Sequence, residues 1–178
     1  MNDTLSTLHD GSPVVIRNIM PSDAAAHRRL IERISSTSRY ERFLHAVDRL
    51  SDIETQHFVE VDGVARVALV ALDPANPDEI IAVARFDREA DPFRAEVAVL
   101  VGDAWQGRGL GTLLVQQLVE RARTDGVSTL VANILATNTR SLSLFHDLGL
   151  PEQRRTRNGM IELKLSLDRS SAEADSPP

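Results

Sequence analysis

The chain has 178 residues, a formal net charge of −6 and no cysteine. This length predicts one domain with a sizeable core, and 42% hydrophobic with 26% charged residues is ordinary for a globular protein. The missing cysteines exclude disulfides, thiolate nucleophiles and cysteine-ligated metals. The sequence has no apolar run of membrane length and no signal-peptide pattern, so we expect a cytoplasmic protein without membrane contact. The acidic balance argues against nucleic acid as the main partner.

Helical and strand patterns alternate along the chain. Residues 1–12 are expected to form a loosely ordered extension, 13–167 one domain, and 168–178 a disordered tail. The predicted elements, in order, are a strand at 14–16, helices over 21–34, 38–47 and 51–58, strands over 64–72, 80–86 and 94–101, a helix over 110–125, a strand over 129–135, a helix over 138–148 and a strand over 160–167. Such an order predicts a mixed α/β sheet with helices on both faces.

A glycine-rich segment joins the strand at 94–101 to the helix that follows. Residues 106–111 read Gln-Gly-Arg-Gly-Leu-Gly. Glycines let successive amides point inward, and a helix start adds unpaired amides and the positive end of its dipole, so the segment predicts a phosphate or pyrophosphate site. A P-loop is excluded because the segment lacks lysine, and a dinucleotide fingerprint because the spacing is Gly-x-Gly-x-Gly. A glycine-rich turn without a ligand is the alternative.

The pattern Gln-x-x-Gly-x-Gly after a strand resembles the coenzyme A pyrophosphate loop of the GNAT superfamily of N-acetyltransferases. The element order over 13–167 is similar to the GNAT fold, and residues 138–150 resemble its second recognisable segment. The resemblance implies a sheet of six to seven strands with a splayed central pair, and acetyl-CoA as acyl donor without a metal. A narrower resemblance, carried by residues 10–12, 36–43 and 95–99, is to bacterial protein lysine acetyltransferases, members of which acetylate acyl-CoA synthetases.

The resemblance assigns the role of general base to Glu96. The attacking amine must be neutral, and a free lysine has a pKa of about 10.4, so a base assists the reaction. Glu96 lies in an otherwise apolar strand, where we expect it on the valine face and partly buried, with a raised pKa. The alternatives are a solvated strand edge or an ion pair with Arg94 or Arg85.

The other implied residues hold the coenzyme. The backbone of Val99, Leu100 and Val101 is expected to bind pantetheine, and one of these amides to face the thioester oxygen. Asn138 is expected on the pantetheine side, although an N-cap would look the same in sequence. The diphosphate is expected to be held by Gln106, Gly107, Arg108, Gly109, Leu110, Gly111 and Thr112. Arg108 would add positive charge, unless it is a plain surface arginine.

Phe145 is the main departure from the family pattern. Many relatives have a tyrosine there that protonates the leaving thiolate, which phenylalanine cannot do. Water or a neighbour such as Ser141 or His146 would act instead, or the thiolate leaves unassisted. The histidines form no metal-ligand pattern, so no metal site is expected.

Three functions remain open at this point. The first is acetyl transfer from coenzyme A to a protein lysine, with an acyl-CoA synthetase as a plausible acceptor from the resemblance. The second is acetylation of a small amine, such as a polyamine, an amino acid or an antibiotic. The third is a non-catalytic acyl-CoA-binding sensor. The sequence predicts neither the acceptor nor whether the protein is a monomer or a homodimer.

Overall fold

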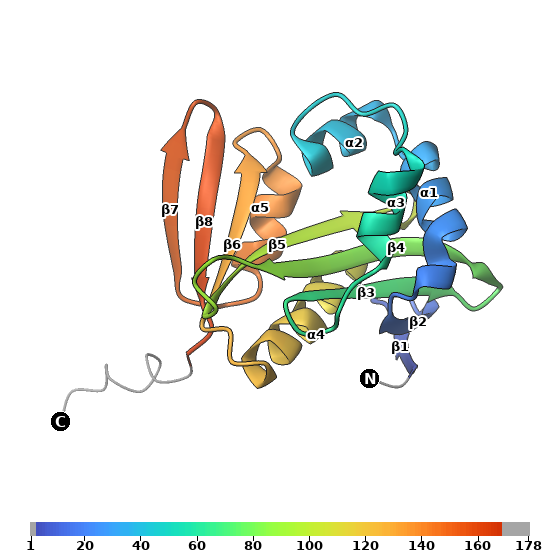
Figure 1. The fold of residues 1–178 in the computed structure, drawn as a ribbon, viewed down its shortest axis with the longest axis horizontal. Coiled ribbons are helices and arrows are strands. Elements are labelled where there is room, and N and C mark those ends of the chain that lie inside the picture. The colour runs from blue at the N-terminus through green and yellow to red at the C-terminus, as the bar shows by residue number, and fades with distance from the viewer. Residues whose placement is uncertain (1–2, 169–178) are drawn as a thin grey trace.

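The computed structural model describes residues 3–168. Its strands are Thr4–Thr7 (β1), Pro13–Asn18 (β2), Arg66–Asp73 (β3), Asn76–Arg88 (β4), Arg94–Val101 (β5), Thr129–Leu135 (β6), Glu152–Arg157 (β7) and Met160–Ser166 (β8). They form one sheet in the order β1-β2-β3-β4-β5-β6-β8-β7 (Figure 1). Among these described pairs β5–β6 is parallel, and the other neighbours are antiparallel.

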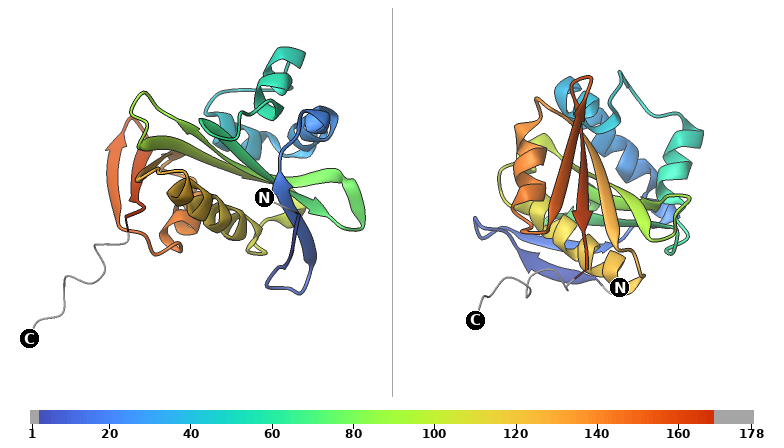
Figure 2. Two further views of the ribbon diagram at one scale, coloured as in Figure 1. Left: turned by 60° about the horizontal axis from the view of Figure 1, so that its bottom comes forward. Right: turned by 90° about the vertical axis from the view of Figure 1, so that its left-hand side faces the viewer.

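Helices cover both faces of the sheet. They are Ala24–Arg33 (α1), Ser36–Phe43 (α2), Asp52–Val59 (α3), Leu110–Thr124 (α4) and Thr139–His146 (α5), with single 3-10 turns at Pro21–Asp23 and Asp103–Trp105. Figure 2 shows α1, α2 and α3 on one side of the sheet and α4 on the other. Local sequence explains their ends: Ser51 and Glu54 form a reciprocal capping box at the start of α3. No helix within residues 3–168 is long and apolar enough to cross a membrane.

Two core layers result from strand alternation. On β4, Ala82, Ala84 and Phe86 face a cluster that includes Leu114 and Leu118 of α4. The intervening Val83 faces the other cluster, with residues of α1 and α3. Successive side chains of a strand point to opposite faces, so the apolar run predicted at this place is buried on both sides.

The central strand pair separates. β5 and β6 pair at Arg94–Thr129, Ala95–Leu130 and Glu96–Val131, and no later pair between them is formed. Beyond this point β5 stays with β4 up to Val101, and β6 stays with β8 up to Leu135. The predicted splay of the central pair is therefore confirmed.

The sheet has eight strands, so the prediction of six to seven is wrong. β1 lies in the segment expected to be loosely ordered, and it pairs with β2 from Thr4–Ile16 to Thr7–Pro13. β7 reads Glu-Gln-Arg-Arg-Thr-Arg and lacks the apolar alternation by which a strand is predicted; it forms against β8, which pairs with it along its whole length.

Smaller differences concern the helix ends and the C-terminus. The helix predicted over 38–47 ends at Phe43, because Leu44 adopts a left-handed φ of 61°. The tail predicted over 168–178 lies outside the described residues, apart from Asp168.

Candidate active site

A cavity of about 470 Å³ opens where β5 and β6 separate. Its walls come from β5, the glycine loop, the start of α4, α2 and α5. All the coenzyme residues predicted from the sequence line it except Arg108, namely Val99, Leu100, Val101, Gln106, Gly107, Gly109, Leu110, Gly111, Thr112 and Asn138. The size is within the usual range for small-molecule sites.

The backbone of β5 faces this cavity at alternate residues. The amide of Gly102 donates to the Ile81 carbonyl at 2.8 Å, which makes these two opposite residues a hydrogen-bonded pair with β4. Antiparallel pairs alternate, so Leu100 also bonds to β4, whereas Val99 and Val101 direct their backbone groups into the gap. The backbone of Val99 and Val101 is therefore not paired with β4, Leu100 also lines the cavity, and pantetheine binding at these residues stays a prediction.

The glycine loop has the backbone that its sequence predicts. Gly107 and Gly109 have φ of 74° and 84°, a left-handed conformation that other residues rarely adopt. At Gly111, in the first turn of α4, a Cβ would lie 2.6 Å from Leu144 Cδ1, so a side chain there would require Leu144 to shift. The free amides at the start of this 15-residue helix are placed to attract an anion.

Arg108 is held away from the cavity. Its Nε donates to Asp10 Oδ2 at 2.5 Å, its Nη2 donates to Ser12 Oγ at 2.6 Å, and its guanidinium lies 4.4 Å from the centre of the Trp105 ring. Hydrogen bonds from the Ser12 amide and from Arg108 lower the pKa of Asp10 to about 2, so Asp10 is an anion that neutralises the arginine. Arg108 thus binds the N-terminal hairpin, which neither of the two sequence-based interpretations anticipated.

The start of the glycine loop is bound to α2. Asp103 accepts hydrogen bonds from the Ser35 amide and the Ser38 hydroxyl, both at 2.6 Å. Desolvation acts to raise the pKa of Asp103, but these hydrogen bonds outweigh it and hold the pKa below its ordinary value. The Gln106 side chain donates to the Val101 carbonyl at 3.0 Å and to Asp103 at 3.1 Å. Gln106 therefore braces the loop.

Glu96 lies at the point where β5 and β6 part, beside a smaller hollow of about 50 Å³. Its side chain is exposed, so the expected partial burial is wrong. The expected valine face is wrong too, since Glu96 alternates with the buried Val97 and shares a face with Leu100. The smaller hollow has Val99 and Asn138 in common with the larger cavity, so Glu96 lies beside a hollow that adjoins this cavity.

The partner of Glu96 is an asparagine on the neighbouring strand. Asn133 Nδ2 donates to Glu96 Oε1 at 3.3 Å. The ion pairs considered from the sequence are not formed, because Arg94 binds Glu89 and Arg85 binds Asp87. Sequence reasoning missed Asn133, since nothing in a single chain reveals which residue of β6 lies beside β5.

Charged side chains surround Glu96 on the α1–α3 face. Asp87 stands directly opposite it on β4 and binds Arg85 and Arg66. Desolvation acts to raise the pKa of Asp87, but the two guanidinium groups outweigh it and hold the pKa low. Burial and the charge of Arg85 lower the pKa of Arg42 to about 10, and Glu96 acts in the opposite sense. Arg42, which lines both hollows, is therefore still a cation at neutral pH.

Two residues of the α5 segment complete the wall. Asn138 accepts a hydrogen bond from the Ser141 amide at 3.0 Å, so it caps α5 while its side chain lines both hollows. Phe145 is buried and lines the smaller hollow. Of the two alternative proton donors, Ser141 lines the cavity, whereas His146 lies 3.6 Å from Glu152, its side chain 70% exposed.

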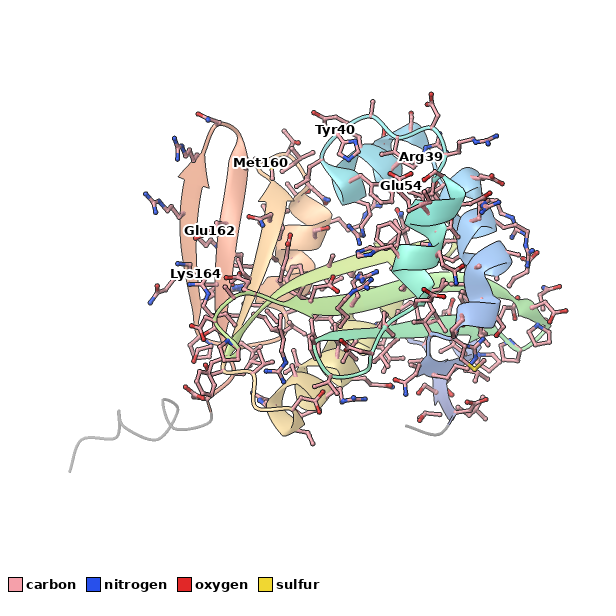
Figure 3. The ribbon with its side chains drawn as sticks, viewed as in Figure 1. Arg39, Tyr40, Glu54, Met160, Glu162 and Lys164 are labelled. Atoms are coloured by element: carbon pink, nitrogen blue, oxygen red, sulfur yellow. The ribbon has the colours of Figure 1, made fainter. Side chains whose placement is uncertain are left out.

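A further hollow opens between α2 and the end of β6. It is lined by Tyr40, Leu135 and Thr137, among others. In Figure 3, Tyr40 on α2 and Met160 on β8 lie at the same end of the molecule. Met160 pairs with Leu135 of β6. The hollow therefore has Tyr40 of α2 on one side and the strands β6 and β8 on the other.

Comparisons with known proteins agree with this geometry. The family described as the acetyltransferase (GNAT) family matches residues 29–150. The crystal structure of the GNAT domain of S. lividans PAT superimposes with a TM-score of 0.85 at 32% identity, over 92% of this chain and 96% of that one. Acetyltransferase PA5475 of Pseudomonas aeruginosa is 28% identical over 151 residues, which are 84% of this chain and 81% of that protein.

A fourth similarity is partial. Acetyltransferase Pat of Mycolicibacterium smegmatis is 32% identical over 135 residues, which are 75% of this chain but 40% of that protein. The chain belongs to the GNAT family of acetyltransferases, which use acetyl-CoA as donor, and it is an N-acetyltransferase. The predicted family, fold and enzyme class are confirmed.

Proposed function

We propose that this protein transfers the acetyl group of acetyl-CoA directly to the side chain of a protein lysine, with Glu96 as general base. The observation that carries the proposal is a pair of adjoining hollows, one at the glycine loop and one at Glu96, which share Val99 and Asn138 as wall residues. A donor and an acceptor can enter these hollows from opposite ends and meet beside β5.

The coenzyme lies along β5 in this proposal. Its diphosphate accepts hydrogen bonds from the amides of the glycine loop and the start of α4. Its pantetheine runs beside the backbone of Val99 and along Asn138, which places the thioester near the point where β5 and β6 part. Val101 is less available, since Gln106 already occupies its carbonyl.

The chemistry follows from this placement. The amine nitrogen attacks the thioester carbon, and its proton passes to Glu96 directly or through a water molecule. The Val99 amide faces the oxygen as it gains charge, and such a donor contributes about 3–4 kcal/mol where it has been removed in other enzymes. The carbon–sulfur bond then breaks, and the thiolate takes a proton from water or from the Ser141 hydroxyl, because Phe145 has none to give.

A lysine of a protein is the acceptor that two similarities support. Residues 10–12, 36–43 and 95–99 resemble bacterial protein lysine acetyltransferases, and the GNAT domain of S. lividans PAT matches nearly the whole chain. Within residues 3–168 the donor site leaves the hollow beside Tyr40 open for a polypeptide segment. An acyl-CoA synthetase is the acceptor that the resemblance suggests.

One observation favours a small amine instead. Arg42 lines the cavity as a cation and forms no hydrogen bond to any described residue, although it stacks on Phe43 and Phe58. A guanidinium without a hydrogen-bond partner suits a carboxylate, so a free amino acid is the second candidate acceptor.

The two candidates are separated by following the label. The protein is incubated with [14C]acetyl-CoA and a lysate of its host, and protein and small-molecule fractions are counted separately. We expect label on a few protein bands, and after proteolysis the label should be recovered in peptides that contain acetyl-lysine. Label confined to small molecules would contradict the lysine proposal, and label in neither fraction would favour an acyl-CoA sensor.

A further inference from the structure

The tip of the N-terminal hairpin is built into the wall of the coenzyme cavity. It joins β1 to β2 and is closed by the Leu8 amide on the Ser12 carbonyl at 2.9 Å and the Gly11 amide on the Leu8 carbonyl at 3.0 Å. Leu8 is 5% exposed and packs into the α4 side of the core. The tip is therefore a fixed part of the fold.

Arg108 fastens this tip to the glycine loop. The arginine lies between two glycines of the loop, and it binds Asp10 and Ser12 of the tip while stacking on Trp105. The one cation within the loop's own sequence is thus paired with a carboxylate. A diphosphate on the loop would meet backbone amides and Arg140, which lines the cavity and donates to Gln106, but it would not meet Arg108.

His9, on the hairpin tip, lies against Gly109 of the loop. A Cβ added to that glycine would be 2.9 Å from His9 Cε1, 3.0 Å from Nδ1 and 3.2 Å from Nε2. The side chain is exposed and lines the large cavity. His9 forms no hydrogen bond to any described residue, so its ring N–H is free to donate to a ligand in the cavity.

We propose that His9 is a coenzyme-binding residue that donates a hydrogen bond to the diphosphate of coenzyme A, and that Arg108 positions it by holding the hairpin tip. The inference rests on the proposed function in one respect, the placement of the diphosphate on the glycine loop. A side chain at residue 109, besides being strained at a φ of 84°, would displace the His9 ring.

The test measures ligand affinities by calorimetry for wild type, His9→Ala and His9→Asn, with His57→Ala as a matched control. His57 is an exposed histidine on α3, outside the lining of the cavity. The ligands are coenzyme A, 3′-dephospho-coenzyme A and pantetheine. We expect His9→Ala to bind the first two about tenfold more weakly and pantetheine unchanged, because a hydrogen bond to a charged group is worth about a tenfold or greater change.

The partial ligands separate this proposal from its competitors. His9→Asn keeps an N–H donor and should recover part of the affinity, which loss of hairpin structure would not allow. A loss seen with coenzyme A but absent with the dephospho form would move the contact to the 3′-phosphate and overturn the assignment to the diphosphate. If His9→Ala bound coenzyme A as tightly as wild type or more tightly, the His9 ring would make no favourable contact with the diphosphate, and the proposal would be wrong. Wild type that binds no coenzyme A would overturn the coenzyme site itself.

Discussion

The two faces of the sheet differ in what they bury. The α4 side has an almost purely apolar core, and the coenzyme loop is attached to it through Leu110 and Leu114. The α1–α3 side contains most of the buried polar and charged side chains of residues 3–168, namely Asp23, His27, Ser38, Thr55 and Arg85. Glu96 and Arg42 belong to this second side.

The difference suggests how one sheet can bind the acyl donor that the family shares on one face and an amine acceptor that differs between members on the other. In our proposal, backbone amides and glycines bind the coenzyme that the family shares, so the α4 side needs few special side chains. The acceptor side depends on charges held in place by one another, such as Asp87 between Arg85 and Arg66. In our account the coenzyme site should respond to backbone changes, and the acceptor site to changes of charge.

The largest effect is expected at the glycine loop. Gly109→Val puts a β-branched residue at a φ of 84° and against the His9 ring, so the loop must change conformation and redirect its amides. Loss of two hydrogen bonds to a charged diphosphate weakens coenzyme A binding about a thousandfold. Isothermal calorimetry measures this directly.

Gly126→Val is the matched control for backbone strain. Gly126 has a φ of 80° and stands beyond the other end of α4, with open space where a Cβ would lie. Both variants should lose about 1–2 kcal/mol of stability, but only Gly109→Val should lose coenzyme affinity. If the two variants bound coenzyme A equally well, the glycine loop would not be the diphosphate site.

The next effect separates the two sides of the sheet. Glu96→Gln removes the base without changing the shape of the side chain, so kcat for acetyl transfer should fall about a hundredfold while the Kd for coenzyme A stays the same. Glu162→Gln changes a carboxylate on β8, which β6 separates from β5, and should leave kcat unchanged; Glu162 pairs with Lys164. Steady-state kinetics with a lysine peptide tests both; an unaltered kcat in Glu96→Gln would remove Glu96 as the base.

The smallest effect at neutral pH concerns the buried charges themselves. His27 is 3% exposed, stacks on Phe58 and has no partner for Nδ1 among the described residues. Burial, with the charges of Arg42 and Arg85, lowers its pKa from 6.5 to about 4. Between pH 6.5 and 4, His27 is therefore protonated in the unfolded chain and neutral in the folded chain. The free energy of unfolding falls as the pH drops through this range.

The variant His27→Leu has no titrating group at this position, so it isolates the contribution of His27 to acid sensitivity. At pH 4 and below, His27 should lower the free energy of unfolding by about 3 kcal/mol relative to neutral pH, and His27→Leu should lack this part of the acid sensitivity. Urea unfolding at several pH values measures the difference between the two curves. Parallel curves for wild type and His27→Leu would show that His27 titrates normally in the folded state.

The glycine loop and the elements on either side of it could be predicted from sequence because their signals are local. Residues 106–111 are contiguous, and the glycine spacing, the preceding apolar strand and the following helix are visible in one short segment. The splay of β5 and β6 followed from the family resemblance. Even here the role of Arg108 was missed, since Asp10 and Ser12 are almost a hundred positions away in the chain.

The acceptor side could not be predicted in the same way because its contacts are not local. Asn133 reaches Glu96 across strands, and Asp103 holds α2 through Ser35 and Ser38. The exposure of Glu96 was misjudged because an apolar strand does not tell which of its faces is left uncovered where two strands part. β7 was missed for a related reason. Its sequence lacks the alternation of apolar residues by which strands are predicted, and it forms a strand because it pairs with β8.

A crystal structure of the protein with coenzyme A tests the central claim most directly. The account predicts the diphosphate on the glycine loop, the pantetheine beside the backbone of Val99 in the gap between β5 and β6, and the sulfur directed toward Glu96. A coenzyme bound outside this gap, or a sulfur directed away from Glu96, would contradict the account.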